Sequence, residues 1–521
     1  MTPMRKFAFW LQGLALSVAL LCIVTDTHAA AFDREGALWI VGKETSGLEE
    51  SLVVRKSLNQ GKDWTVMARL NGEKTAAAGD ERPRIAFGLA GEIYVTYSRP
   101  LAKPYTSELR FIRSEDGGLH FSAPLTVHKD HQVITHGFAS MVVDARGAIY
   151  ISWIDKRDLQ AAKDKGAAYT GAAQYYAVSV DGGKSFGGDY KIADNTCECC
   201  RSAIALDQQG RPTLMWRHVF APNVRDHAIV TLTRDGKLAP PKRASFDNWA
   251  IDACPHQGPS IAFGGDGRRH QTWFTGGTDG GLFYAAQQAD GKLGAPMRLG
   301  GEQSSHADVA VSGKRVEIVW KQFDGAATSI AGLRSTDGGA TWRPRVWATT
   351  SGMSEQPRLA QDGDRIHLIW RTALEDVVTI ELAADAKPAI ASFGADGMEQ
   401  IAASQAGKPY VLLVWSLDCV YCHASIKNLA AKPDAGFGVV TLAIDPAADA
   451  ASRDAIIDAT ASLGANADSW AFGELPAEQL RYRIDPRWHG ELPRSYWFDA
   501  AGRQVAAHSG LIKPEMIARY R

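Results

Sequence analysis

The chain has 521 residues, enough for two or three hydrophobic cores, so a multidomain protein is expected. Hydrophobic residues make up 45% and charged residues 22% of the sequence, a globular composition that excludes a disordered chain. The formal net charge of -1 and the lack of a long basic run give no electrostatic reason to expect nucleic-acid binding.

The first thirty residues have the pattern of an export signal. Arg5 and Lys6 precede an apolar stretch at 11–24, and in Thr-His-Ala at 27–29 the first and last residues are small, as signal peptidase requires. The apolar stretch is shorter than the about 20 residues that a membrane span needs. We therefore predict a cleaved signal peptide over residues 1–29, a periplasmic or secreted protein and no stable membrane span. A retained anchor is the alternative.

From Ala31 to about Ala391 the sequence repeats a unit of roughly fifty residues. Each unit has an apolar strand, a Gly or Asp turn and a second strand that often ends in an aromatic residue. A clear example is the unit in which residues 85–87 form the first strand and residues 93–95 belong to the second. Seven such units of short strands are typical of a β-propeller. We predict an all-β propeller over residues 31–387, with seven blades favoured and six as the alternative.

A second motif marks the late hairpin of several units. It reads Ser-x-Asp-Gly-Gly, begins at Ser114, Ser179 and Ser335, and has a worn copy at Ser57. The aspartate can bond the backbone of the turn, and glycine supplies positive φ. The motif resembles the Asp box of sialidase-like, or BNR-repeat, propellers. The resemblance implies a fold and not an activity.

Sialidases have similar blades but need an arginine triad, an acidic residue and a tyrosine nucleophile. The sequence offers several arginines and gives no means of selecting three: Arg82, Arg84, Arg201, Arg217 and Arg371. Sialidases are also typically six-bladed. An exo-sialidase-like glycoside hydrolase is therefore only a second alternative for the function.

After residues 387–388 the pattern changes to alternating strands and helices. The expected elements are a strand at 410–415, a helix at 423–432, a strand at 438–444, a helix at 451–463 and a closing hairpin at 496–505. This order predicts a separate α/β domain over residues 388–521.

Cys419 and Cys422 form a CxxC motif that follows a buried strand and opens a helix. A helix N-terminus lowers the pKa of a thiol, so Cys419 is expected to attack and Cys422 to resolve the mixed disulfide. About seventy residues later comes Glu-Leu-Pro-Arg-Ser, which includes Pro493. Together these features resemble thioredoxin-fold proteins of the TlpA-like kind, in which a cis-proline faces the CxxC pair. The resemblance covers about the last 125 residues and implies Cys419, Cys422 and Pro493 as catalytic residues.

Two features of this segment leave alternatives open. Asp418 stands where such domains usually have tryptophan, and Val420-Tyr421 lacks their common proline. With His423 the motif also reads CxxCH, the pattern of c-type haem attachment. An inert disulfide is the third reading. The thioredoxin-like reading is favoured because it also explains the preceding strand and the later proline.

Four of the six cysteines outside the predicted signal lie in the propeller: Cys197, Cys199, Cys200 and Cys254. The loops before first strands converge at one end of a propeller axis. We therefore expect these cysteines to share an axial site with His136, His256 and His306. Thiolates and imidazoles together suit copper or zinc. Two structural disulfides, or a redox-active cluster that exchanges with the C-terminal domain, are the alternatives.

These observations predict an exported thiol–disulfide oxidoreductase whose propeller binds a partner, a ligand or a soft metal. The first alternative is a metal-handling protein that uses the propeller cysteines and histidines, with copper or zinc. The redox pair itself requires no cofactor. The expected partner is a thiol or disulfide protein, or the chain's own propeller cysteines, and nucleic acid is not expected.

Overall fold

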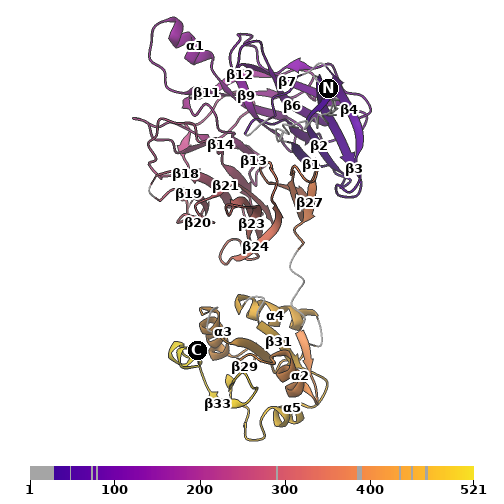
Figure 1. The fold of residues 1–521 in the computed structure, drawn as a ribbon, viewed down its shortest axis with the longest axis vertical. Coiled ribbons are helices and arrows are strands. Elements are labelled where there is room, and N and C mark those ends of the chain that lie inside the picture. Colours follow the sequence, from indigo (N-terminus) through magenta and orange to yellow (C-terminus); the bar gives the residue numbers. More distant parts are fainter. Residues whose placement is uncertain are drawn as a thin grey trace, which may run out of the picture. The chain divides into compact units, whose positions relative to one another are not determined.

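The computed structural model divides into two compact units, Met1–Gly339 with Pro344–Glu381 and Ala340–Arg343 with Leu382–Arg521 (Figure 1). The described residues are 28–46, 49–71, 74–77, 80–277, 279–288, 291–383, 390–432, 436–447, 450–463 and 467–520. Residues 1–27 of the predicted signal peptide and the boundary at 387–388 lie outside them. Across these ranges, no helix is long and apolar enough to cross a membrane.

The first unit is built from seven antiparallel sheets, six of four strands and one of three within the described residues. The first strands are β1 (Ala29–Phe32), β5 (Arg84–Phe87), β9 (His136–Val143), β13 (Ala203–Leu206), β17 (Ser260–Phe263), β21 (Ser304–Ser312) and β25 (Arg358–Asp362). The second strands are β2 (Leu38–Ser46), β6 (Ile93–Pro100), β10 (Ile149–Asp155), β14 (Pro212–Arg217), β18 (Arg269–Thr275), β22 (Arg315–Phe323) and β26 (Arg365–Trp370).

Each sheet continues outward in chain order. The third strands are β3 (Glu49–Ser57), β7 (Ser107–Ser114), β11 (Ala172–Ser179), β15 (His227–Thr231), β19 (Gly281–Ala286), β23 (Thr328–Ser335) and β27 (Val378–Glu381). The fourth strands are β4 (Thr65–Asn71), β8 (Leu125–Thr126), β12 (Gly187–Thr196), β16 (Lys242–Arg243), β20 (Met297–Leu299) and β24 (Arg343–Thr350). One short helix, α1 (Arg157–Asp164), joins β10 to β11.

The seven sheets form a closed ring. Each first strand contacts the first strand of the next sheet, and β25 contacts β1. The closing joint is made by side chains: the rings of Phe32 and His367 lie 4.5 Å apart, and Phe32 packs with Leu38, Ala360 and Ile369. The seven-bladed all-β propeller predicted from the sequence is therefore confirmed.

The blades pack through the second strands, which are buried on both faces. All seven residues of β10 are buried, including Trp153, and β14 is equally buried. Trp216, Trp273 and Trp370 occupy corresponding positions near the ends of other second strands, Trp39 lies near the start of β2, and all four are fully buried. A strand between two neighbouring sheets is covered on both faces, which explains why apolar residues predominate in β10 and β14.

A repeated turn follows the third strand in four blades. The hydroxyl of Ser114 donates to Asp116 (2.8 Å) and accepts from the backbone N–H of Gly118 (2.9 Å). The turns that begin at Ser57, Ser179 and Ser335 have the same pair of bonds, with Asn59 in place of aspartate in the first. The glycine has positive φ, as such a turn requires.

The second unit is a mixed six-stranded sheet with helices, in the order β28-β31-β30-β29-β32-β33. The first four strands are parallel, whereas β32 and β33 are antiparallel. The strands are β28 (Ile390–Phe393), β29 (Tyr410–Trp415), β30 (Gly438–Ala443), β31 (Ala467–Phe472), β32 (Arg494–Phe498) and β33 (Gln504–Ser509). The helices are α2 (Gly397–Ser404), α3 (Val420–Ala430), α4 (Ala450–Thr460), the 3₁₀ turn Ala461–Leu463, α5 (Ala477–Ile484) and α6 (Pro514–Arg519).

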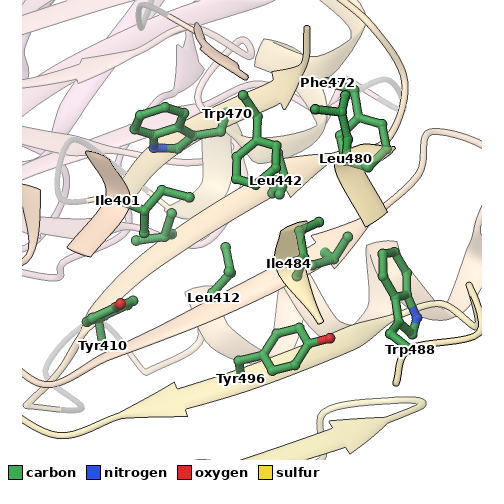
Figure 2. Close-up of a cluster of buried hydrophobic side chains, with 13 residues drawn as sticks. Ile401, Tyr410, Leu412, Leu442, Trp470, Phe472, Leu480, Ile484, Trp488 and Tyr496 are labelled. Atoms are coloured by element: carbon green, nitrogen blue, oxygen red, sulfur yellow. The ribbon is translucent and has the colours of Figure 1, made fainter. Parts of the chain in front are cut away.

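Alternate residues of β29 supply two cores, one on each face of the sheet. Leu412 packs with Leu442, Trp470 and Tyr496 on one face (Figure 2). Leu413 belongs to the core on the opposite face, with residues of α3 and α6. Because every residue of β29 is buried, its sequence reads as one apolar run.

Candidate functional site

A pocket lies on the propeller axis, and the first strands of all seven blades contribute to it. Its volume is about 560 Å³. The polar residues that line it include Arg82, Arg84, Arg201, Arg358, Ser202 and Asp308. A wider hollow of about 1030 Å³ lies between blades 4 and 5. The axial pocket is the stronger candidate site because four arginines converge there.

The arginines reach the axis because of their positions relative to the first strands. Arg84 begins β5 and Arg358 begins β25. Arg82 and Arg201 lie two residues before β5 and β13. The innermost strands of a propeller surround its channel, so residues at their starts meet even when they are far apart in sequence.

A buried network joins three blades at the same end of the axis. Nη1 of Arg201 donates to Oδ1 of Asp80 (3.0 Å) and to Oε1 of Gln356 (3.1 Å). Nε2 of Gln356 also donates to Oδ1 of Asp80 (2.9 Å). Burial alone would raise the pKa of Asp80, but the charge of Arg201 and the other donors hold it below its ordinary value. Asp80 is therefore ionised and neutralises Arg201.

Arg82 and Arg84 have no hydrogen bond or ion pair to a carboxylate within the described ranges. Nη2 of Arg82 donates to Gln356, while its Nε and Nη1 are buried without a hydrogen-bond partner. Nη1 of Arg84 donates to the carbonyls of Arg82 (3.3 Å) and Pro83 (3.1 Å). Burial, and then the charge of Arg358, lowers the pKa of Arg84 to about 9 and that of Arg82 well below its ordinary value. The charges of Glu355, Glu81 and Asp80 act on these two groups, but the pocket holds two guanidinium groups without a direct carboxylate partner in the described part of the chain.

Two further carboxylates near these arginines have partners of their own. Glu81 accepts hydrogen bonds from the hydroxyl of Ser98 (2.6 Å) and the backbone N–H of Phe138 (2.7 Å). Burial raises the pKa of Glu81, which weakens it as a counter-ion. Glu355 accepts from the backbone N–H of His28 (3.0 Å).

Asp308 is the single carboxylate among the residues that line the described pocket. Its Oδ1 accepts from the hydroxyl of Ser260 (2.6 Å), and its Oδ2 accepts from the backbone N–H of Leu359 (2.9 Å). Nη1 of Arg358 lies 3.5 Å from the same Oδ2. Both oxygens are thus engaged, and no tyrosine is among the described lining residues. The arrangement is suited to binding an anion rather than to nucleophilic attack.

The structure brings together three of the seven residues predicted to form a metal site. The sulfurs of Cys197, Cys199 and Cys200 lie 3.8, 3.8 and 3.9 Å apart, and all three residues are buried. Nη1 of Arg225 lies 3.4 Å from the Cys197 sulfur. Hydrogen bonds from the other two thiols, with the nearby charges of Arg217 and Arg225, lower the pKa of Cys197 to about 3.

The other four predicted ligands lie elsewhere in the described structure. Cys254 is exposed and unpaired. His136 is buried and stacks on His128, with ring centroids 3.8 Å apart. Nε2 of His306 lies 3.2 Å from the carbonyl oxygen of His256, so these two residues are neighbours. Within the described ranges, the metal-ligand cluster consists of the three thiols alone.

The CxxC motif forms a disulfide between Cys419 and Cys422, with the Cα atoms 5.2 Å apart. Cys419 is the N-cap of α3, and its sulfur accepts from the backbone N–H of Cys422 (3.2 Å). Cys422 is buried, while the intervening Val420 and Tyr421 are exposed. Pro493 follows a cis peptide bond and directly precedes β32, the strand that pairs with β29.

Sequence reasoning did not select the arginine pocket. It named Arg82, Arg84 and Arg201 among five arginines without a basis for choosing them, and it missed Arg358. Arg217 lies apart, where it donates to the carbonyls of Arg225 and Phe274. The signal that could have found the pocket is an arginine at, or two residues before, the start of a first strand.

No family model matches the chain, and no curated protein matches it. Matching solved structures include an ulvan lyase of a polysaccharide lyase family, at 10% identity over 68% of this chain and 93% of that chain, with a TM-score of 0.43. An α-L-arabinanase from Penicillium chrysogenum matches at 13% identity over 62% of this chain and 92% of that chain, with a TM-score of 0.39. An α-L-arabinofuranosidase from Fusarium graminearum matches at 14% identity over 62% of this chain and 92% of that chain, with a TM-score of 0.38. The likeness concerns the fold alone.

These matches contradict the function predicted from the sequence. That prediction, an exported thiol–disulfide oxidoreductase with a binding propeller, depended on the CxxC pair of the smaller unit. These three structures are of carbohydrate-active enzymes, and the matches cover between 62% and 68% of this chain. The prediction is therefore wrong, because a motif in the smaller unit does not define the activity of a chain whose larger part is a propeller.

Proposed function

We propose that the propeller binds an acidic sugar, through its carboxylate, in the axial pocket. The observation that carries this proposal is the pair Arg82 and Arg84, two pocket guanidinium groups without a carboxylate partner among the described residues. A guanidinium offers a planar pair of donors that matches the two oxygens of a carboxylate. A bound carboxylate would be the direct partner that both groups lack among those residues.

The size and remaining lining of the pocket favour a sugar acid over a simple inorganic ion. A volume of about 560 Å³ lies within the range of small-molecule sites. The hydroxyls of Ser140 and Ser202 can exchange hydrogen bonds with sugar hydroxyls, and they lie on different blades. Ile85 and Phe263 provide apolar surface for a pyranose ring. An anchored anion with a polar and an apolar side is the chemistry of a uronic acid.

Binding, rather than hydrolysis, is the activity proposed. Canonical glycosidases use two carboxyl groups on either side of the scissile bond, about 5 to 9 Å apart. The carboxylates at this site have fixed structural partners: Asp80 pairs with Arg201, and Asp308 accepts from Ser260 and Leu359. Neither is positioned as a free acid or base.

Titration calorimetry with D-glucuronate on the full chain tests the proposal, with glucose as the neutral control ligand. We expect glucuronate to bind and glucose to fail. Arg84→Gln should weaken glucuronate binding at least tenfold, because a hydrogen bond to a charged group contributes about 1.5–3 kcal/mol. Arg211→Gln, which alters an exposed arginine on a blade 4 turn, should bind like the wild type. No binding of glucuronate, or equal binding by Arg84→Gln, contradicts the proposal.

We also propose finer fold assignments for both units. The serine–aspartate turns are interpreted as Asp boxes of the BNR type, supported by their shared hydrogen bonds. The α/β unit is interpreted as thioredoxin-like, supported by the CxxC pair at the start of α3 and by Pro493 before β32. An exported chain and a redox-active Cys419–Cys422 pair belong to the same interpretation.

The redox assignment concerns the cysteine pair itself. Dithiothreitol treatment followed by alkylation should label two more thiols in the wild-type chain than in Cys419→Ser/Cys422→Ser. The same count in both proteins would contradict an exchangeable pair.

A further inference from the structure

The three buried thiols of the propeller form a nearly equilateral triangle, with sulfur–sulfur distances of 3.8, 3.8 and 3.9 Å. A point equidistant from three atoms at these separations lies about 2.2 Å from each of them. That distance is close to the about 2.3 Å of a metal–thiolate bond. The triangle therefore has the dimensions of three thiolates around one metal ion.

The local sequence explains why the sulfurs converge. Cys197 follows the end of β12, and its backbone N–H donates to the carbonyl of Arg217 (3.0 Å). The chain then turns at residues 198–199, which brings Cys197 and Cys200 face to face. Glu198, the remaining side chain of the motif, pairs with Lys156 instead of joining the sulfurs. The turn thus presents three thiols and no carboxylate.

Two arginines supply positive charge beside the thiols. Nη1 of Arg225 lies 3.4 Å from the sulfur of Cys197, and its Nε donates to the carbonyl of Ile251 (2.7 Å). Arg217 is buried and donates to backbone carbonyls, not to a carboxylate. Three thiolates and two guanidinium groups together have a net charge of -1. A monovalent cation would bring this net charge to zero, whereas a divalent cation would leave a net positive charge.

The number of ligands also discriminates between metals. In the described part of the chain, the cluster of metal-ligating atoms has three members. Protein zinc sites are almost always four-coordinate, whereas soft thiolate donors also select Cu(I). All three cysteines are less than 7% exposed, so the site leaves little room for a solvent ligand.

From this geometry we propose that Cys197, Cys199 and Cys200 bind one Cu(I) ion as a three-thiolate site, with Arg217 and Arg225 balancing the charge. The site is separate from the arginine pocket and does not depend on the sugar-binding proposal. It requires reduced thiols, and binding releases whatever thiol protons are present.

The test uses the full chain in the Cys419→Ser/Cys422→Ser background, which removes the competing dithiol. The reduced protein is titrated anaerobically with Cu(I) against bicinchoninate, a coloured Cu(I) chelator. We expect one Cu(I) per chain to be withheld from the chelator. X-ray absorption at the copper edge should show three sulfur neighbours at about 2.2–2.3 Å.

Matched variants assign the site. Cys199→Ser should lose at least a hundredfold in Cu(I) affinity, while Cys254→Ser, which changes the exposed propeller cysteine, should bind like the parent. Arg225→Met leaves all three ligands in place and should weaken binding at least threefold, so the proposal does not depend on Cys199→Ser folding. Circular dichroism spectra show whether each variant is folded like the parent protein.

Three results would overturn the proposal. The first is no Cu(I) retained against the chelator by the parent protein. The second is a loss of Cu(I) affinity in Cys254→Ser as large as the loss in Cys199→Ser. The third is tight retention of Zn²⁺ with four ligands in place of Cu(I).

Discussion

Replacement of Asp80 by asparagine removes the carboxylate that neutralises Arg201 inside the propeller. The two side chains are 0% and 2% exposed, and they lie 3.0 Å apart. Removal of one partner from a buried ion pair costs about 3–5 kcal/mol, because the other charge is left uncompensated. Asp80→Asn should therefore lower the free energy of unfolding of the propeller by about 3–5 kcal/mol, helped by the repulsion among Arg82, Arg84 and Arg201.

A double-mutant cycle separates the ion pair from simple loss of packing. Asp80→Asn, Arg201→Met and the double variant are compared by urea denaturation, with the transition of the α/β unit as an internal reference. Because the double variant leaves no orphaned charge, its loss should be smaller than the sum of the single losses by at least about 1 kcal/mol. Additive losses, with coupling below about 0.5 kcal/mol, would refute the claim that Asp80 neutralises Arg201.

Three further predictions concern other parts of the propeller. Arg84→Met should stabilise the ligand-free propeller by about 1 kcal/mol, because it removes a guanidinium that is desolvated, lies near Arg358 and Arg201 and has no direct carboxylate partner within the described ranges, and calorimetry in anion-free buffer measures the shift. Burial, and then the charge of His136, lowers the pKa of His128 to about 3, so the unfolded chain binds a proton that the folded chain refuses. Stability should therefore fall as the pH drops from about 6.5 towards 3, by up to about 1.4 kcal/mol per pH unit for this group, and His128→Gln should flatten that slope in pH-dependent denaturation. Ser179→Ala should cost about 1 kcal/mol in urea denaturation because the N–H of Gly183 loses its acceptor, whereas Ser185→Ala at the exposed end of the turn should cost less.

The architecture of the propeller was predictable because each blade has the same local pattern of strand and turn residues. The second strands are buried on both faces, so they appear as apolar runs that end in residues such as Trp153 and Trp216. The turn chemistry of Ser114 and Ser179 is equally local. The count of seven blades followed from the seven repeated strand units, and the closed ring confirms it.

The candidate sites were less accessible to sequence reasoning because they depend on contacts between distant blades. Asp80, Arg201 and Gln356 meet at the axis although the chain separates them by 121 and 155 residues. We predicted one shared cysteine–histidine site on the assumption that each loop before a first strand directs its cysteine or histidine side chain toward the axis. Cys197 and Cys200 instead turn toward each other, and His136 stacks on His128 within its own blade.

The central claim is tested most directly by a crystal structure of the protein soaked with D-glucuronate. We expect difference density for one sugar in the axial pocket, with its carboxylate within hydrogen-bond distance of the guanidinium groups of Arg82 and Arg84. Glucuronate bound on another surface, or an empty axial pocket at a ligand concentration that saturates binding in solution, would contradict it.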